Sequence, residues 1–283
     1  MRLLDYLERV GLTVLPRADI DALRRLHIAH RETFLFENLS IQAGGGISVA
    51  LEDIERKFLD ERRGGYCFEH NTLFTAVLND VGFGTTALLG RVRRGPPERW
   101  CRTHMVLKVD VAGEPWLADV GFGALGLLEP IPLREGAQGR QVDLEYSLRR
   151  DGPVWVLSTL GPDPTAPDRI TRTDLYEFSE DPQTPGDVEV ANHYTSTHPN
   201  SMFRRNLIVQ QTTRKGRTML RHDGITRYQD GTVIAETVDA AQLPAAARDL
   251  FGIDLPPGPY VFEQYGRDGR TPATNLGGSR SLI

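Results

Sequence analysis

The chain has 283 residues, of which 40% are hydrophobic and 25% charged, so it is long enough to bury a sizeable apolar core. The net charge of −5 gives no reason to expect nucleic acid or an anionic membrane as a partner. Two cysteines do not make a disulfide framework, the first residues (MRLLDYLERVGL) are too charged for a signal peptide, and no apolar run of about 18 residues is present. We therefore expect a cytoplasmic protein.

The first third of the chain is helical in pattern. Four apolar residues recur at helical spacing: Leu3, Leu4, Leu7 and Val10. Gly11 comes directly after them, at the position of a C-terminal helix cap. Asp19 precedes a second apolar stripe over residues 20–34, and further helices are expected over 48–59 and 66–79. The short loops between these segments predict a small helical bundle.

From about Thr85 the pattern changes to strands. Short segments rich in β-branched and aromatic residues are bounded by Gly, Pro and Asp: 85–92, 104–111, 115–122, 142–150 and 153–160. The stretch 161–169 (GPDPTAPDR) is typical of a proline-rich connection, 218–237 of hairpins that turn at Asp-Gly, and 243–250 of a short helix. The sequence therefore predicts an α+β protein, with helices first, then a meander or small antiparallel β-barrel, then a mixed C-terminal part.

One of the two cysteines, Cys67, stands in the segment RRGGYCFEHN (62–71). Gly64 and Gly65 allow another backbone to approach closely, and apolar residues continue after the cysteine at helical spacing. A thiol in the first turn of a helix feels the positive end of the helix dipole, which favours the thiolate. A free cysteine is also often a small buried apolar residue, so these features alone leave a nucleophilic and a structural role open.

A thiolate nucleophile needs a base, and several histidines compete for that role. His70 lies one helical turn after the cysteine, whereas His193 and His198 lie in a polar, turn-rich stretch. His104 begins a predicted strand, with its side chain on the face opposite the row of alternating apolar residues.

His104 also has a candidate orienting carboxylate. If the strands around it form a hairpin that turns at VAGE (111–114), Asp119 lies opposite Val106 and diagonal to His104. Diagonal neighbours are ~7–8 Å apart at their Cα atoms, within reach of an imidazole and a carboxylate. Such a pair also offsets the cost of burying a lone carboxylate in this apolar, glycine-rich segment. The sequence therefore predicts a triad of Cys67, His104 and Asp119.

Other motifs are rejected. GFGALG (121–126) has the form of a dinucleotide-binding fingerprint, but Pro130 and Pro132 forbid the helix that must follow. Cys101 is a weaker nucleophile candidate, because it lies in an arginine-flanked loop with no helix start. The chain has no CxxC, HExxH or P-loop pattern, so neither a metal site nor nucleotide hydrolysis is expected.

With these residues in place, the chain resembles the arylamine N-acetyltransferases, in their prokaryotic form. The matching pieces run through most of the chain: FLFENLS (34–40), RGGYCFEHN (63–71), THMVLKV (103–109), ADVGFG (118–123) and HPNSMFRRNLIVQ (198–210). The RGGxCxExN signature, with a downstream strand histidine and a DxGFG element, is a specific combination. Leu35 stands where many relatives have a proline, which bears on loop rigidity and leaves the chemistry alone.

The resemblance implies a cysteine-protease-like core in three parts: a helical bundle over 1–84 with the cysteine, a β-barrel over 85–195 with the histidine and aspartate, and an α/β lid over 196–283. It implies a ping-pong reaction through Cys67, His104 and Asp119. Its co-substrate would be acetyl-CoA, its acceptor a small arylamine or hydrazine, with no metal. The aromatic rings that line the family's acceptor pocket fall on Phe36, Phe122 and Phe203.

Supporting roles and alternatives complete the prediction. Glu37 and Arg63 are expected to form a buried bidentate pair that positions the cysteine loop. The arginine-rich stretches 91–102 and 214–221 are expected to be mainly solvated, and no CoA-binding residue is assigned. Three other functions stay open: an amide synthase of the same superfamily with a carrier-bound acyl donor, a Cys-His-Asp hydrolase, and a catalytically silent binding module.

Overall fold

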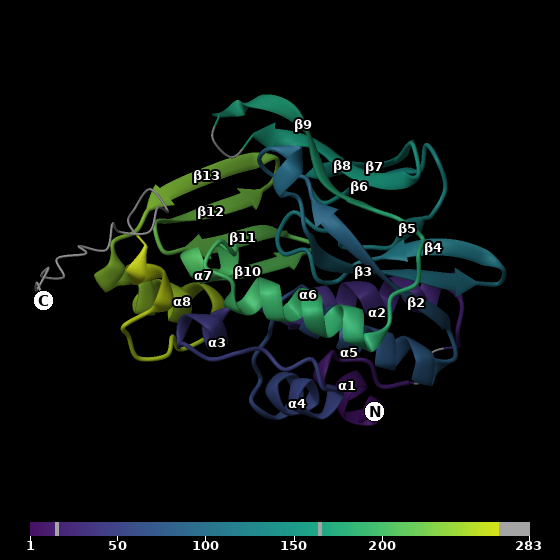
Figure 1. Ribbon diagram of the computed structural model, residues 1–283, viewed down its shortest axis with the longest axis horizontal. Coiled ribbons are helices and arrows are strands. Elements are labelled where there is room, and N and C mark those ends of the chain that lie inside the picture. The colour runs from purple at the N-terminus through teal and green to yellow at the C-terminus, as the bar shows by residue number, and fades with distance from the viewer. Residues whose placement is uncertain (15–16, 164–165, 266–283) are drawn as a thin grey trace, which may run out of the picture.

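Helices form the N-terminal part of the protein, as the sequence predicts (Figure 1). The computed structural model describes residues 1–14, 17–163 and 166–265. The helical elements of this part are α1 (Leu3–Arg9), α2 (Ile20–Thr33), α3 (Leu39–Gln42), α4 (Leu51–Glu55), the π-helix η1 (Arg56–Asp60) and α5 (Cys67–Val81). The Asp19 carboxylate accepts a hydrogen bond from the Ala22 N–H at 2.8 Å and so caps α2, as expected.

The helix expected over 48–59 differs in its start and in its second half. It begins at Leu51, because Ala50 is extended and serves as the residue before the helix. It then widens into η1, in which the Glu61 N–H bonds to the carbonyl of Arg56. Phe58 remains fully buried, so the apolar face is kept despite the change of helix type.

Eight antiparallel strands form the central sheet, which curls into a nearly closed barrel in the order β5-β4-β3-β2-β9-β8-β7-β6 (Figure 1). Their bounds are β2 (Gly84–Val92), β3 (Arg102–Val111), β4 (Glu114–Ala118), β5 (Ile131–Pro132), β6 (Gln138–Gln141), β7 (Leu144–Asp151), β8 (Val154–Asp163) and β9 (Ala166–Phe178). Strand β3 separates two apolar clusters. Met105 and Leu107 pack with the helices, whereas Val106 packs inside the barrel. The predicted alternation is confirmed, and it turns the face of His104 toward the barrel.

The stretch 161–169 is not the connection that its prolines predicted. Its two ends belong to β8 and β9, which pair with each other, and residues 164–165 lie outside the described residues. Pro162 lies opposite Ile170 and beside a register shift, a place in a ladder where a proline is tolerated.

A second antiparallel sheet joins the two ends of the chain in the order β1-β10-β11-β12-β13. Its strands are β1 (Phe36–Glu37), β10 (Ile208–Thr213), β11 (Gly216–Arg221), β12 (Gly224–Gln229) and β13 (Thr232–Thr237). The two expected hairpins are present; β12 and β13 turn at Asp230-Gly231, both with positive φ. The pairing of β1 with β10 is not foreseen by the sequence pattern, and it sets Phe36 beside the C-terminal part of the chain.

The remaining helical elements are α6 (Pro185–Thr197), α7 (Met202–Arg205), α8 (Leu243–Phe251) and the 3-10 turns η2 (Pro97–Arg99), η3 (Ala240–Gln242) and η4 (Val261–Gln264). Helix α8 confirms the short helix expected over 243–250, and α6 packs against β3. No helix in the described ranges is long and apolar enough to cross a membrane. The α+β fold is confirmed, while the three-part division at residues 84 and 195 stays a prediction.

Candidate active site

Two glycines let the loop before α5 lie against β1. Gly65 donates its N–H to the Leu35 carbonyl at 3.2 Å, and its own carbonyl accepts the Glu37 N–H at 2.7 Å. A Cβ on Gly64 would collide with the Leu35 carbonyl, and one on Gly65 with the Glu69 carboxylate. The close approach expected of the RGG motif is therefore present, and it fixes where α5 begins.

Cys67 is the first residue of α5, and its side chain is buried. Sγ donates a weak hydrogen bond to the Thr103 carbonyl at 3.6 Å, directly before His104 in the chain. Burial raises the pKa of this thiol, although the N–H groups of Met105 and Phe68 favour the thiolate. The expectation that the helix start favours a thiolate stays a prediction.

His104 and Asp119 form a buried pair. The β3–β4 hairpin turns at VAGE (111–114) in the predicted register, so that Asp119 follows β4 at the position opposite Val106. His104 Nε2 donates to Asp119 Oδ2 at 2.8 Å. Because Nε2 is engaged by the carboxylate, Nδ1 is the ring nitrogen that remains for proton transfer.

The Asp119 carboxylate stays ionised despite complete burial. Burial alone would raise its pKa, but the charge and hydrogen bond of His104, the Gly121 N–H at 2.9 Å and the Asn71 amide at 3.2 Å bring the pKa to about 2. A permanent anion in this position can hold an imidazole in one orientation and stabilise its protonated form.

Asn71, which stands in the RGGxCxExN signature without a predicted role, ties three elements together. Its amide nitrogen donates to the Met105 carbonyl at 2.7 Å as well as to Asp119. Its amide oxygen accepts the Val120 N–H at 3.3 Å. One side chain on α5 therefore links β3 to the segment that follows β4, and the RGGxCxExN signature was the signal that pointed to it.

His27 is a second residue without an assigned role. Its Nε2 accepts the Asp119 N–H at 3.1 Å, while Nδ1 donates to the Leu128 carbonyl at 2.8 Å. Such bonds to side chains replace the sheet ladder after Ala118, which is why β4 is shorter than the strand expected over 115–122. Nothing in the local pattern around His27 pointed to this contact.

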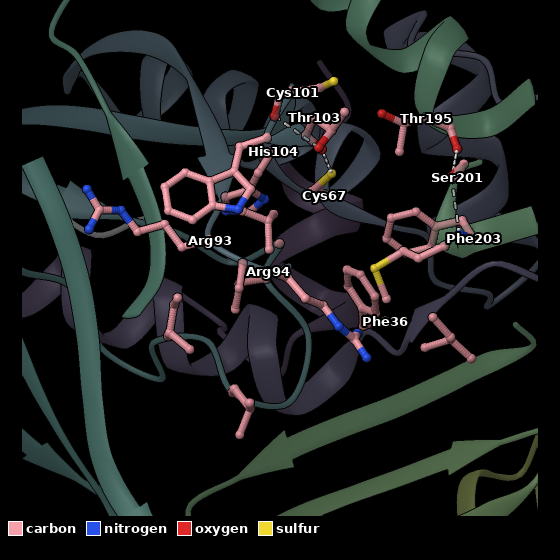
Figure 2. Close-up of a pocket in the computed structure, with 18 of the residues that line it drawn as sticks. Phe36, Cys67, Arg93, Arg94, Cys101, Thr103, His104, Thr195, Ser201 and Phe203 are labelled. Atoms are coloured by element: carbon pink, nitrogen blue, oxygen red, sulfur yellow. Dashed lines mark hydrogen bonds between the residues drawn. The ribbon is translucent and has the colours of Figure 1, made fainter. Parts of the chain in front are cut away.

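A cavity of about 580 Å³ brings the predicted residues together (Figure 2). Five of them line it: Phe36, Cys67, His104, Phe122 and Phe203. The Phe122 and Tyr176 rings lie 5.0 and 4.8 Å from the His104 ring between centroids. The Phe36 and Phe203 rings lie 6.0 Å apart. The thiol, the imidazole and three aromatic walls therefore face one space, and Asp119 lies behind His104.

Glu37 and Arg63 are paired, though not in the bidentate form expected. The Nη2 atom of Arg63 donates to Glu37 Oε1 at 2.8 Å and to the Ser40 hydroxyl at 3.3 Å. Lys57, for which the sequence predicted no role, lies 3.7 Å from Glu37 and 2.7 Å from Glu69. The other oxygen of Glu37, Oε2, accepts the Leu39 N–H at 2.6 Å, so Arg63 bonds to one carboxylate oxygen instead of two.

His70, the alternative base, is engaged elsewhere. Its Nε2 donates to the Leu35 carbonyl at 3.1 Å, so Nδ1 accepts from His30 Nε2 at 2.8 Å. Burial lowers the pKa of His70 to about 3. His193 and His198 do not line the cavity in the described part of the chain.

The segment GFGALG (121–126) is a loop held by two buried arginines, Arg31 on α2 and Arg217 on β11. They donate to four carbonyl groups, those of Val120, Gly123, Ala124 and Gly126. Arg217 is buried and pairs with Asp143 at 3.0 Å, so the expectation of a solvated stretch over 214–221 is wrong at this residue. In the described residues the next element after the loop is the strand β5, whereas a dinucleotide fingerprint requires a helix.

Cys101 is exposed in an irregular segment at the rim of the same cavity, and its Sγ contacts the Arg99 carbonyl at 3.7 Å. Within the described ranges, no group of three His, Cys, Asp or Glu side chains is placed to hold a metal ion.

A helix-borne cysteine beside a buried histidine–aspartate pair is the arrangement of thiol-dependent acyl-transfer and hydrolytic enzymes. The model of the N-acetyltransferase family matches residues 19–259. Two curated arylamine N-acetyltransferases, from Mycolicibacterium smegmatis and Escherichia coli, are 37% and 33% identical over 88% of this chain and 91% and 88% of their own lengths. The chain therefore belongs to the arylamine N-acetyltransferase family and is an acyltransferase.

Solved structures agree with this assignment. The M. smegmatis arylamine N-acetyltransferase matches with a TM-score of 0.82 and 36% identity, over 90% of this chain and 93% of that chain. The Mycobacterium marinum enzyme, solved in complex with CoA, matches with a TM-score of 0.81 and 32% identity, over 89% and 92%. The predicted family and fold are confirmed.

Proposed function

We propose that this enzyme transfers acetyl groups from acetyl-CoA to arylamines and arylhydrazines through an acetyl thioester on Cys67. Membership of the family supports acetyl transfer to arylamines, and the M. marinum relative binds CoA. The observation that carries the mechanism is the 2.8 Å contact between His104 and Asp119, buried beside the cavity that Cys67 also lines.

In the first half-reaction, His104 Nδ1 accepts the Cys67 proton while Sγ attacks the carbonyl carbon of the donor thioester. The bond from that carbon to the CoA sulfur breaks, and the imidazolium returns the proton, so that CoA leaves as a thiol. Burial raises the pKa of the Cys67 thiol, so the sulfur depends on His104 to take its proton. Before this step the Cys67 thiol gives up its weak hydrogen bond to the Thr103 carbonyl and forms a hydrogen bond to His104 instead.

In the second half-reaction, the amine nitrogen attacks the acetyl carbon and the bond to Sγ breaks. His104 takes a proton from the nitrogen and returns one to the sulfur, which restores the enzyme. An aromatic amine is mostly neutral near pH 7, so it needs no deprotonation before it attacks. Exchange of acetyl between two thiols is close to neutral in energy, and a thioester reacts with a weak amine more readily than a serine ester does.

The surrounding residues have supporting roles in this scheme. Asp119 orients His104 and stabilises the imidazolium, and N–H groups at the start of α5 hold the oxyanion. Phe36, Phe122 and Phe203 form the walls for the acceptor ring and exclude water, which distinguishes a transferase from a hydrolase. Glu37 and Arg63 position the cysteine loop.

Intact-mass spectrometry tests the proposal directly. Mixing the protein with acetyl-CoA should add about 42 Da on Cys67, and an aniline or hydrazide should remove the adduct. An adduct that decays equally fast in water alone would indicate a hydrolase. No adduct at all would indicate a different acyl donor, as in an amide synthase.

A further inference from the structure

Arg31 is a buried cation that the proposed mechanism does not use. It lies on α2 with only 4% of its surface exposed, and within the described ranges it forms no ion pair with a carboxylate. Arg217, the other buried arginine beside the same loop, pairs with Asp143 at 3.0 Å. Burial lowers the pKa of Arg31 to about 10, so the guanidinium stays charged near pH 7. Burying a cation without a paired anion costs free energy, which its hydrogen bonds have to offset.

The hydrogen bonds of Arg31 lie on both sides of Phe122. Nη1 donates to the Val120 carbonyl at 3.2 Å, and Nη2 donates to the Gly123 carbonyl at 2.5 Å. Nη2 also donates to the Thr212 hydroxyl at 2.9 Å, which ties the same group to β10. A guanidinium is planar and rigid, so it fixes the chain before and after this ring relative to two other elements.

The Phe122 ring depends on these neighbouring bonds for its position. It lines the cavity, and its centroid lies 5.0 Å from the centroid of the His104 ring and 5.0 Å from that of the Tyr176 ring. The backbone of Phe122 itself forms no hydrogen bond with the described residues. The bonds from Arg31 are therefore the nearest polar contacts that hold this wall of the cavity.

Asp119, three residues before Phe122, has supports of its own. His27 accepts the Asp119 N–H at 3.1 Å, and the Asn71 amide donates to the carboxylate at 3.2 Å. Neither bond involves Arg31. Loss of the guanidinium should therefore displace the Phe122 ring and leave the carboxylate in place.

We propose that Arg31 is a positioning residue for the second half-reaction, which holds the Phe122 ring against the acceptor through the carbonyls on either side of that ring. The ring in turn sets where the arylamine lies relative to the acetyl group on Cys67. A displacement of about 1 Å in such a contact costs up to about a hundredfold in rate. This inference rests on the proposed function and deepens only its second step.

Two substitutions and two rates test the inference. Arg31→Met keeps a long apolar side chain and removes all three hydrogen bonds, whereas Arg31→Lys keeps the charge with a single donor group. In a ping-pong reaction kcat/KM for aniline reports the second half-reaction alone. It should fall about tenfold to a hundredfold in Arg31→Met and less in Arg31→Lys. The rate of CoA release without acceptor, which reports the first half-reaction, should stay at the wild-type value.

A double-mutant cycle separates positioning from a general loss of structure. If Arg31 acts through the Phe122 ring, Arg31→Met should lower kcat/KM for aniline in the wild-type background and have no further effect in Phe122→Ala. An equal fall in both backgrounds would overturn the inference, and so would a first half-reaction slowed as much as the second. Should Arg31→Met fail to fold, Arg31→Lys in both backgrounds completes the same cycle.

Arg25→Met is the matched control, because Arg25 is an exposed arginine on the same helix and does not line the cavity. It should change neither rate.

The two proposals fail in different ways. Wild-type protein that acetyl-CoA does not label would overturn the proposed function, and this inference with it. Labelled protein in which Arg31→Met leaves kcat/KM for aniline unchanged would overturn only the inference.

Discussion

His27 on α2 holds Asp119 by its backbone, with Nε2 accepting the Asp119 N–H at 3.1 Å. The other nitrogen of the ring bonds to the Leu128 carbonyl at 2.8 Å, so the imidazole is fixed at both ends. Burial lowers its pKa to about 4, which keeps it neutral and able to accept this bond. A residue outside the cavity lining thus sets the position of the carboxylate that pairs with His104.

Replacing His27 by alanine should lower both stability and the rate of acetyl transfer. The Asp119 N–H and the Leu128 carbonyl lose their partner inside the core, and each buried unsatisfied group costs about 1–3 kcal/mol. Urea denaturation measures the loss of stability, and the rate of CoA release measures the effect on Asp119. His193→Ala, at an exposed histidine, should change neither quantity. A His27→Ala protein that folds less stably yet reacts at the wild-type rate would rule out the positioning role.

Asp119→Asn should reduce the turnover rate by about a thousandfold or more, because the imidazolium loses its anionic partner and the ring loses its fixed tautomer.

Cys67→Ser should abolish the acetyl adduct while the fold stays intact. Steady-state kinetics and circular dichroism on both variants check these outcomes. Robust turnover by either variant would remove its residue from the mechanism.

Local sequence patterns predicted much of the fold. The apolar spacing of the first helices, the Asp19 cap and the alternation of β3 all concern residues within a few positions of one another. The VAGE turn at 111–114 fixed the register of one hairpin, and the register placed Asp119 diagonal to His104. Contacts of this kind depend on turn geometry and side-chain period, which a sequence displays directly.

Contacts between distant segments were not predictable in the same way. Phe36 pairs with Gln210 through a strand of two residues, too short to give a periodic signal. Arg217 looked like one member of a solvated basic stretch, but it is buried against Asp143 and loop carbonyls. Such roles depend on which segments the completed fold brings together, and residue type alone does not reveal them.

Mild acid should destabilise the protein through three buried histidines: His27, His30 and His70. Burial lowers the pKa of each, to about 4 for His27 and about 3 for His70. In the unfolded chain these groups titrate near 6.5, so below that pH the unfolded state binds more protons than the folded state. The free energy of unfolding should therefore fall as the pH drops from about 6.5 to 4, by up to about 1.4 kcal/mol per pH unit for each histidine.

Urea denaturation at several pH values between 7.5 and 4.5 measures this slope. Glu69, whose pKa is raised by burial, opposes the trend, and Asp119, with a pKa of about 2, contributes only in stronger acid. His27→Gln should show a shallower slope than wild type. A slope that is the same in both proteins would mean that His27 is not the neutral buried group inferred from its contacts.

Gly121→Ala should impair both acetyl transfer and stability. A Cβ at this position would lie 2.6 Å from Asn71 Nδ2 and 2.8 Å from Cys67 Cα, closer than such atoms approach. The loop must then move away from α5, and Asp119 and Phe122 move with it. A displacement of this kind costs about tenfold to a hundredfold in rate, and overpacking costs about 1–3 kcal/mol in stability. Gly46→Ala is the matched control, because a Cβ there meets nothing within 4 Å. Acetylation of Gly121→Ala at the wild-type rate would show that contact between this loop and the cysteine is not required for the reaction.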